Sequence, residues 1–290
     1  MELFLQLTLT GLTNGAILAL AALGFVLIYK SSDVINFAQG EFLLIGAYLI
    51  YGMVVQFGLH WTFGMVITLL IAVLLGVLIE RLILRPMIGE PVISIIMVTI
   101  GLSSLLRAIV SAIWGNLPRA FPAFIPTDPV TILGAKIGAD RLWAIAIAVV
   151  MLVLFSLFFR KSKEGIAMRA VADDQTAALS MGISVSRVFA WAWAIAAASA
   201  AIGGALVANI VGVGPELANF GLRVFPVVIL GGLDSIPGAI LGGIIIGLLE
   251  TYTGGYIGQG LNQVLPFVVL IVILMVRPYG LFGQEIIERV

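Results

Sequence analysis

Long apolar runs dominate this chain and constrain its fold more than any other feature. About 20 mostly apolar residues in a helix span the roughly 30 Å of membrane hydrocarbon, and runs of this length recur along the 290 residues. With 61% hydrophobic and only 10% charged residues, a soluble globule could not cover its surface. The runs lack the alternation of outer-membrane barrel strands. The sequence therefore predicts an all-α, polytopic membrane bundle whose helices satisfy their own backbone.

Hydropathy predicts about eight to ten spans within a single transmembrane domain, residues 1–290. The first run follows Met1 and Glu2 without a basic region and is longer than a signal peptide's apolar core, so a retained span is expected. The two shortest candidates are the pieces 220–230 and 239–249 of a glycine-rich region. The predicted spans are residues 3–28, 34–57, 63–84, 92–114, 142–159, 185–211, 220–230, 239–249 and 265–276.

The distribution of Lys and Arg predicts the orientation, because basic residues in short loops stay on the cytoplasmic side. The segment 160–187 is predicted inside, since it holds Arg160, Lys161, Lys163, Arg169 and Arg187. The segment 115–140 then lies outside as an ordered or semi-extended surface loop. It contains Pro118, Pro122, Pro126 and Pro129.

Several kinds of chemistry are excluded by what the sequence lacks. There is no cysteine and His60 is the only histidine, so thiol catalysis and metal sites built on Cys or His clusters are ruled out. None of the four lysines follows a glycine, so there is no Walker A loop for ATP. Net charge is zero, and no basic field suggests nucleic acid. We predict a transport protein that is not an enzyme and holds no metal or cofactor of its own.

One polar stretch, residues 35–41, interrupts a hydrophobic segment. Charged groups at membrane depth cost about 2.5–3.5 kcal/mol and usually face a cavity or another helix. We expect Asn36, Gln39 and Glu41 to line a translocation pathway, with Gly40 allowing a helix break. The alternative is that the two amides hydrogen-bond between helices while Glu41 lies at the interface.

A second stretch, 224–250, combines a turn signal with small residues four apart. It predicts a broken or re-entrant helix, although tight packing without solute contact is the favoured interpretation. The residues involved are Gly231, Gly232, Ser235, Pro237 and Gly238.

A third stretch, 164–182, predicts a short amphipathic helix in the cytoplasmic segment. Asp173 or Asp174 would cap it and Gly182 would end it. Such a helix fits a groove on a soluble partner, or else lies on lipid headgroups. The candidate coupling residues are Glu164, Gly165, Arg169, Asp173, Ala177, Ala178 and Gly182.

Six stretches, in order, resemble the permease subunits of branched-chain amino-acid ABC importers, the LivH/LivM family. The family's central motif often reads Asn-Phe-Ala-His-Gly-Glu; here Gln39 replaces the histidine and cannot titrate near neutral pH. The Asn-Phe-Ala form and the short C-terminal end are similar to LivH. The stretches are 11–20, 35–41, Glu80-Arg81 with Arg85-Pro86, 165–182, 231–238 and 277–283.

The resemblance implies a multi-pass permease of the inner (cytoplasmic) membrane that imports branched-chain or related amino acids. Its partners would be two ATPase subunits that bind ATP and Mg, a second LivM-like permease or another copy of the chain, and an external solute-binding protein. The 164–182 segment would be the coupling helix. Permeases of the same architecture for urea, amides or other small organic acids are the alternative, and a stand-alone channel or secondary carrier is the rival class.

Overall fold

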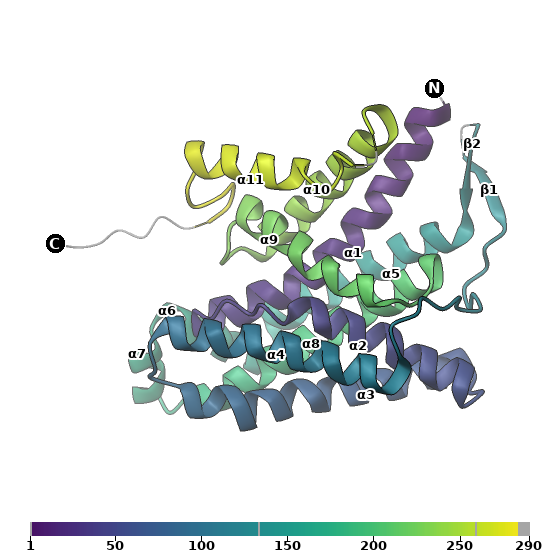
Figure 1. Cartoon of the computed structure of the whole chain (residues 1–290). Coiled ribbons are helices and arrows are strands. Elements are labelled where there is room, and N and C mark those ends of the chain that lie inside the picture. Colours follow the sequence, from purple (N-terminus) through teal and green to yellow (C-terminus); the bar gives the residue numbers. More distant parts are fainter. Residues whose placement is uncertain (1, 133, 259, 284–290) are drawn as a thin grey trace.

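The structure is a computed structural model that describes residues 2–132, 134–258 and 260–283. It is almost entirely helical, as predicted (Figure 1). The α-helices are α1 (Glu2–Ser32), α2 (Gln39–Tyr51), α3 (Trp61–Ile79), α4 (Val92–Trp114), α5 (Ala139–Lys161), α6 (Lys163–Asp173), α7 (Gln175–Ser180), α8 (Val185–Val211), α9 (Phe220–Gly231), α10 (Ile236–Tyr256) and α11 (Leu265–Val276). Short π or 3-10 segments are η1 (Gly52–Gln56), η2 (Glu80–Leu84), η3 (Arg85–Met87) and η4 (Pro215–Asn219).

Six of these helices are long and apolar enough to cross a membrane: α1, α3 with its continuation to Met87, α4, α5, α8 and α10. The remaining apolar segments of the described chain are shorter, namely α2, α9 and α11. The predicted glycine-rich piece 239–249 belongs to the full-length α10. The predicted segment 34–57 instead starts late, because α2 begins only at Gln39. The eight to ten predicted segments thus correspond to six long helices and three short ones.

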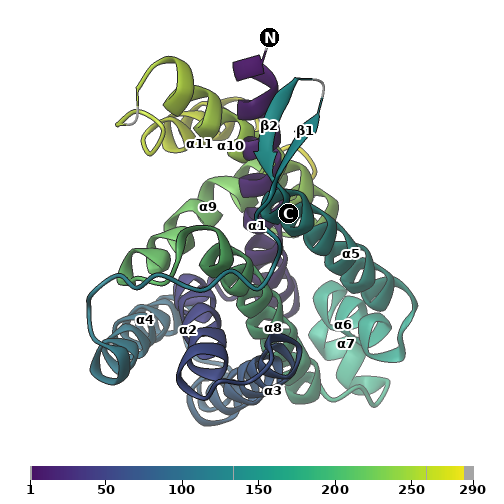
Figure 2. The ribbon, with the colours of Figure 1, turned by 90° about the vertical axis from the view of Figure 1, so that its right-hand side faces the viewer.

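Helix α1 lies at the centre of the bundle. In its most apolar stretch, 89% of the residues are buried by the rest of the chain, against 17% for α4 and 22% for α5. Helices α8, α9 and α10 surround it (Figure 2). Small residues permit this packing: a Cβ on Gly15 would lie 2.7 Å from the Gly243 oxygen of α10. Close backbone approach through small residues is how membrane helices associate without a hydrophobic drive between them. Helices α4 and α5 therefore present most of their apolar surface outward.

The two ends of the bundle differ in charge. Figure 1 shows α6 and α7 at one end and the hairpin of β1 and β2, near the N-terminus, at the other. Lys30, Arg85 and Arg187 also lie at the first end. Lys30 donates to the backbone oxygen of Asp234 (3.2 Å), and Arg85 donates to the backbone oxygen of Ser186 (3.4 Å). Arg187 lies 3.8 Å from Glu164. This basic end is the side that the charge rule assigns to the cytoplasm.

The proline-rich segment 115–140 contains more regular structure than the surface loop we predicted. Strands β1 (Pro129–Ile132) and β2 (Ala135–Gly138) pair antiparallel, with Ile132 opposite Ala135. Val130, Thr131 and Ile132 are β-branched, and Gly134 has φ +89°, so the local sequence favours a tight hairpin. Arg119 also forms a backbone bridge with Val213, which attaches the segment to the end of α8.

Candidate translocation and coupling sites

The polar stretch 35–41 lies at a break between α1 and α2. Helix α1 ends at Ser32, Asp33 adopts φ +54°, and residues 33–38 are not helical. The Ala38 N–H donates to the Asn36 side-chain oxygen (3.0 Å), which gives the backbone a partner other than a helix carbonyl. The predicted break is therefore present, but it precedes Gly40 rather than lying at it.

The amides of this stretch connect three helices. Gln39 Nε2 donates to the backbone oxygens of Ala21 on α1 (3.1 Å) and Ala196 on α8 (3.4 Å). Asn36 Nδ2 donates to Gln39 Oε1 (3.2 Å). Both side chains are nearly inaccessible, at 1% and 2% exposed. In this chain Gln39 forms the interhelical hydrogen bonds that we considered as the alternative role, and Asn36 bonds within the stretch, to Gln39 and Ala38.

Glu41 forms a buried ion pair that was not predicted from the sequence. Its carboxylate lies 2.7 Å from the guanidinium of Arg107 on α4. The Glu41 side chain is 3% exposed, whereas that of Arg107 is 47% exposed. Arg107 is the only charged residue of α4, and a lone charge within a span is itself a signal of function. Glu41 is thus buried within the bundle, in the first turn of α2, and paired with a residue of α4.

A second ion pair joins α9 to α10. Arg223 Nη1 lies 3.5 Å from Glu250 Oε2, and the Glu250 side chain is 6% exposed. Its other oxygen, Oε1, has no hydrogen-bond partner in the described part of the chain. Glu41 and Glu250 are therefore both buried within the bundle, and each of them faces an arginine.

The glycine-rich stretch forms a tight helix–turn–helix. Helix α9 ends at Gly231, Gly232 adopts φ +107°, and α10 starts after Ser235 with Pro237 in its first turn. The Gly238 N–H donates to Ser235 Oγ (3.1 Å), an N-cap. A Cβ on Gly231 would collide with the Gly238 backbone. These five predicted residues lie together, in the arrangement that close packing requires.

The coupling segment consists of two short helices, α6 and α7, rather than one. Asp173 is the last residue of α6, and Asp174 caps α7: its Oδ1 accepts from the Ala177 N–H (2.9 Å). Gly182 follows the end of α7 with φ +81°. Of the two aspartates proposed as the cap, Asp174 has that role.

The predicted coupling residues do not share one face. Gly165 and Ala178 are buried against the bundle, and Glu164 faces Arg187. Arg169 donates to the backbone oxygens of Phe159 (3.1 Å) and Arg160 (3.3 Å), so it satisfies the C-terminal carbonyls of α5. The surface of α7 instead exposes Ala177, Leu179 and, just after the helix, Met181 (83% exposed). Leu179 was absent from the predicted set, although its apolar side chain in a polar segment was a visible signal.

In the described residues no group of three or more His, Asp and Glu side chains could hold a metal ion. A bundle with six potential spans, buried ion pairs between its helices and a basic end carrying two short helices has the architecture of a multi-pass membrane protein. Residues 7–274 match the family profile described as branched-chain amino acid transport system / permease component. The chain belongs to this family and is LivH-like; it is the permease component of an ABC transport system, without ATPase activity of its own.

Close relatives cover the whole chain. The high-affinity branched-chain amino acid transport system permease protein LivH of Salmonella typhimurium (strain LT2) is 32% identical, over 99% of this chain and 98% of the relative. LivH of Escherichia coli (strain K12) is 33% identical and BraD of Pseudomonas aeruginosa 30%, with the same coverage. No solved structure matches. The predicted resemblance is confirmed.

Proposed function

We propose that the chain imports branched-chain or closely related amino acids across the inner membrane. The observation that carries the proposal is the near-complete coverage by relatives that are named as high-affinity branched-chain amino acid permeases. At about one third identity the family is secure, while the solute rests on this likeness. Urea, amides and other small organic acids are the solutes against which the proposal is tested.

The complex would contain two ATPase subunits, which bind ATP and Mg, a second LivM-like permease or another copy of this chain, and an external solute-binding protein. Helices α6 and α7 support an ATPase contact, because they lie at the basic end and expose Leu179 and Met181. Isolated exposed apolar residues are ordinary, but two that lie close together, one on α7 and one directly after it, suit a partner's groove.

Solute would cross beside the Asn36, Gln39 and Glu41 cluster, with Arg107 as the group that reaches the surface. A half-exposed arginine facing lipid at membrane depth would be costly. The α4 surface around Arg107 is therefore better suited to a water-filled pathway or to the second permease. A zwitterionic amino acid carries one carboxylate and one ammonium group, and the Arg107–Glu41 pair offers a partner for each.

The rival class, an ion-coupled carrier, requires a membrane-buried carboxylate that is free to bind and release its ion. Glu41 and Glu250 each face an arginine instead, at 2.7 and 3.5 Å. Both carboxylates are therefore already paired with a cation of the chain itself. These contacts support a permease driven by separate ATPases.

The deciding experiment measures solute-stimulated ATPase activity of the assembled complex with its own binding protein. We expect stimulation by leucine, isoleucine or valine, and none by urea or aromatic acids. Stimulation by another solute alone would overturn the proposed cargo but keep the permease. Uptake by the chain alone, without nucleotide or ATPases, would overturn the mechanism.

A further inference from the structure

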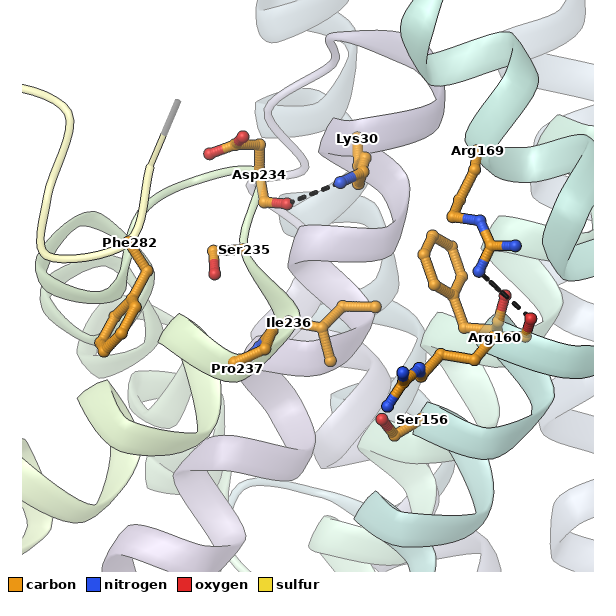
Figure 3. Close-up of a pocket in the computed structure, with 10 residues that line it drawn as sticks. Lys30, Ser156, Arg160, Arg169, Asp234, Ser235, Ile236, Pro237 and Phe282 are labelled. Carbon is orange, nitrogen blue, oxygen red and sulfur yellow. Dashed lines mark hydrogen bonds between the residues drawn. The ribbon is translucent and has the colours of Figure 1, made fainter. Parts of the chain in front are cut away.

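A cavity of about 310 Å³ opens at the basic end of the bundle, between the ends of α1, α5 and α10. Figure 3 shows the side chains around it, which come from segments far apart in the sequence. Polar and charged groups include Lys30, Ser156, Arg160, Arg169 and Ser235, and apolar groups include Phe159, Ile236, Pro237 and Phe282. Neither the translocation cluster nor the exposed surface of α7 contributes to this cavity.

The charge of the lining is strongly one-sided. Lys30, Arg160 and Arg169 are cations from three different helices, and Asp234 is the single acidic residue of the lining. In Figure 3 the Asp234 carboxylate points away from Arg160 and Arg169. The N-terminus of the 21-residue α10 adds a partial positive charge at Ser235 and Ile236. The field in the cavity therefore favours an anion.

Two of the cations already have partners, and the third has none among the described residues. Lys30 donates to the Asp234 backbone oxygen (3.2 Å), and Arg169 donates to the oxygens at the end of α5. Within the described residues, no hydrogen bond or ion pair occupies the Arg160 guanidinium. Its planar donors match the oxygens of a phosphate group. Arg160 is accordingly the principal ligand expected for an anion here.

The cavity also has an apolar part that a free anion would not need. Ser156 and Phe159 lie one turn or less before Arg160 on α5, toward the membrane interior, and Ile236 and Pro237 begin α10. Basic groups near helix ends lie at the depth of lipid headgroups, with apolar side chains toward the hydrocarbon. Basic pockets between transmembrane helices on the cytoplasmic side bind anionic headgroups. From this combination we propose that the cavity binds the phosphate of an anionic phospholipid from the cytoplasmic leaflet.

The test uses the assembled transporter in a mild detergent, titrated with phosphatidylglycerol, phosphatidylcholine or inorganic phosphate. Bound lipid is counted by native mass spectrometry, and stabilisation is followed by thermal unfolding. Each basic residue near a membrane surface contributes about 1 kcal/mol of attraction, so Arg160→Gln should weaken phosphatidylglycerol binding about fivefold. Ser156→Leu, which fills the cavity without changing charge, should weaken it as well.

Lys161→Gln is the matched control, because Lys161 is exposed on the next position of α5 and does not line the cavity. It should bind phosphatidylglycerol like the unmodified protein. Equal binding of phosphatidylcholine, or equal effects of Arg160→Gln and Lys161→Gln, would overturn the site. A third outcome is that inorganic phosphate stabilises the protein as much as phosphatidylglycerol does, and that Arg160→Gln reduces both effects equally. That result would retain phosphate recognition at the site but overturn the lipid as its source.

Discussion

The Glu41 carboxylate and the Arg107 guanidinium are close enough for a strong charge-assisted hydrogen bond, at 2.7 Å. Removing one partner of a buried pair leaves an uncompensated charge and typically costs 3–5 kcal/mol. Because Arg107 is about half exposed, we expect Arg107→Gln to lower the free energy of unfolding by about 3 kcal/mol, at the lower end of that range. Denaturant unfolding of the purified permease in detergent measures this loss.

The double variant Glu41→Gln/Arg107→Gln is the informative companion. It removes both charges, so it should recover much of the stability that Arg107→Gln loses. Glu90→Gln, at an exposed position in the described chain, should leave stability within about 0.5 kcal/mol of the starting protein. Additive losses in the double variant would show that the two side chains do not interact.

Sequence polarity was enough to single out Asn36, Gln39 and Glu41, but not to identify their contacts. Arg107 lies 66 positions from Glu41, and its pairing depends on how α4 packs beside α2. The partners of Gln39 are backbone oxygens of Ala21 and Ala196, which no residue-type signal reveals. Whether a polar residue in a span lines a pathway or joins helices is decided by tertiary packing.

Helices α2 and α9 cross where two glycines meet. A Cβ on Gly40 would lie 2.5 Å from the Ala218 oxygen and 2.6 Å from the Gly221 Cα, so neither helix can yield without moving its backbone. We expect Gly40→Ala to destabilise the permease by about 1–3 kcal/mol through overpacking. The change is measured as a lower melting temperature in detergent.

Gly101→Ala on α4 provides the matched control for this crossing. A Cβ there would meet no atom within 4 Å, and alanine is the better helix former by up to about 1 kcal/mol. Its melting temperature should be unchanged or higher. A Gly40→Ala protein as stable as Gly101→Ala would mean that α2 and α9 are not in close contact.

The exposed side of α7 is the proposed contact for the ATPase subunits. Leu179→Asp should reduce co-purification of the ATPase subunits several-fold, because a charge replaces an exposed apolar side chain at the proposed contact. Arg169→Glu is a poor probe, since it would also disturb the end of α5. The control is Ser180→Asp, where the hydroxyl already bonds within α7 to Thr176. Normal ATPase recovery and turnover with Leu179→Asp would remove α7 from the contact.

Among the elements, the long helices were predicted well from the apolar runs, because a single segment in lipid can satisfy its backbone hydrogen bonds only as a helix. The predictions were weaker where local side-chain hydrogen bonds determine the residue at which a helix begins or ends. The start of α2 depends on the Asn36 side chain bonding to the Ala38 N–H, and the division between α6 and α7 depends on Asp174 as a cap. The β1–β2 hairpin was missed because prolines suggested a loop, while the β-branched run 130–132 was given no weight.

At the scale of the whole molecule, the charge rule and the packing agree on two distinct ends. Lys30, Arg85 and Arg187, from different helices, each contact groups at the same end as α6 and α7. The hairpin lies at the other end, and the Arg119–Val213 bridge follows the C-terminus of α8, the helix that begins after α7. Helix α5, whose 23 residues extend roughly 34 Å, connects the two ends. Labelling on either side of this helix can therefore show which end of the bundle faces the cytoplasm.

Single cysteines at the two ends of α5 decide the orientation, since the chain has no cysteine of its own. Lys136→Cys places a thiol on the exposed side of β2, and Lys161→Cys places one at the last residue of α5. In intact cells lacking an outer-membrane barrier, a membrane-impermeant maleimide should label the first and not the second. In inside-out vesicles the pattern should reverse. Labelling of both from one side would mean that α5 does not cross, and the opposite pattern would place α6 and α7 outside, where no ATPase subunit could reach them.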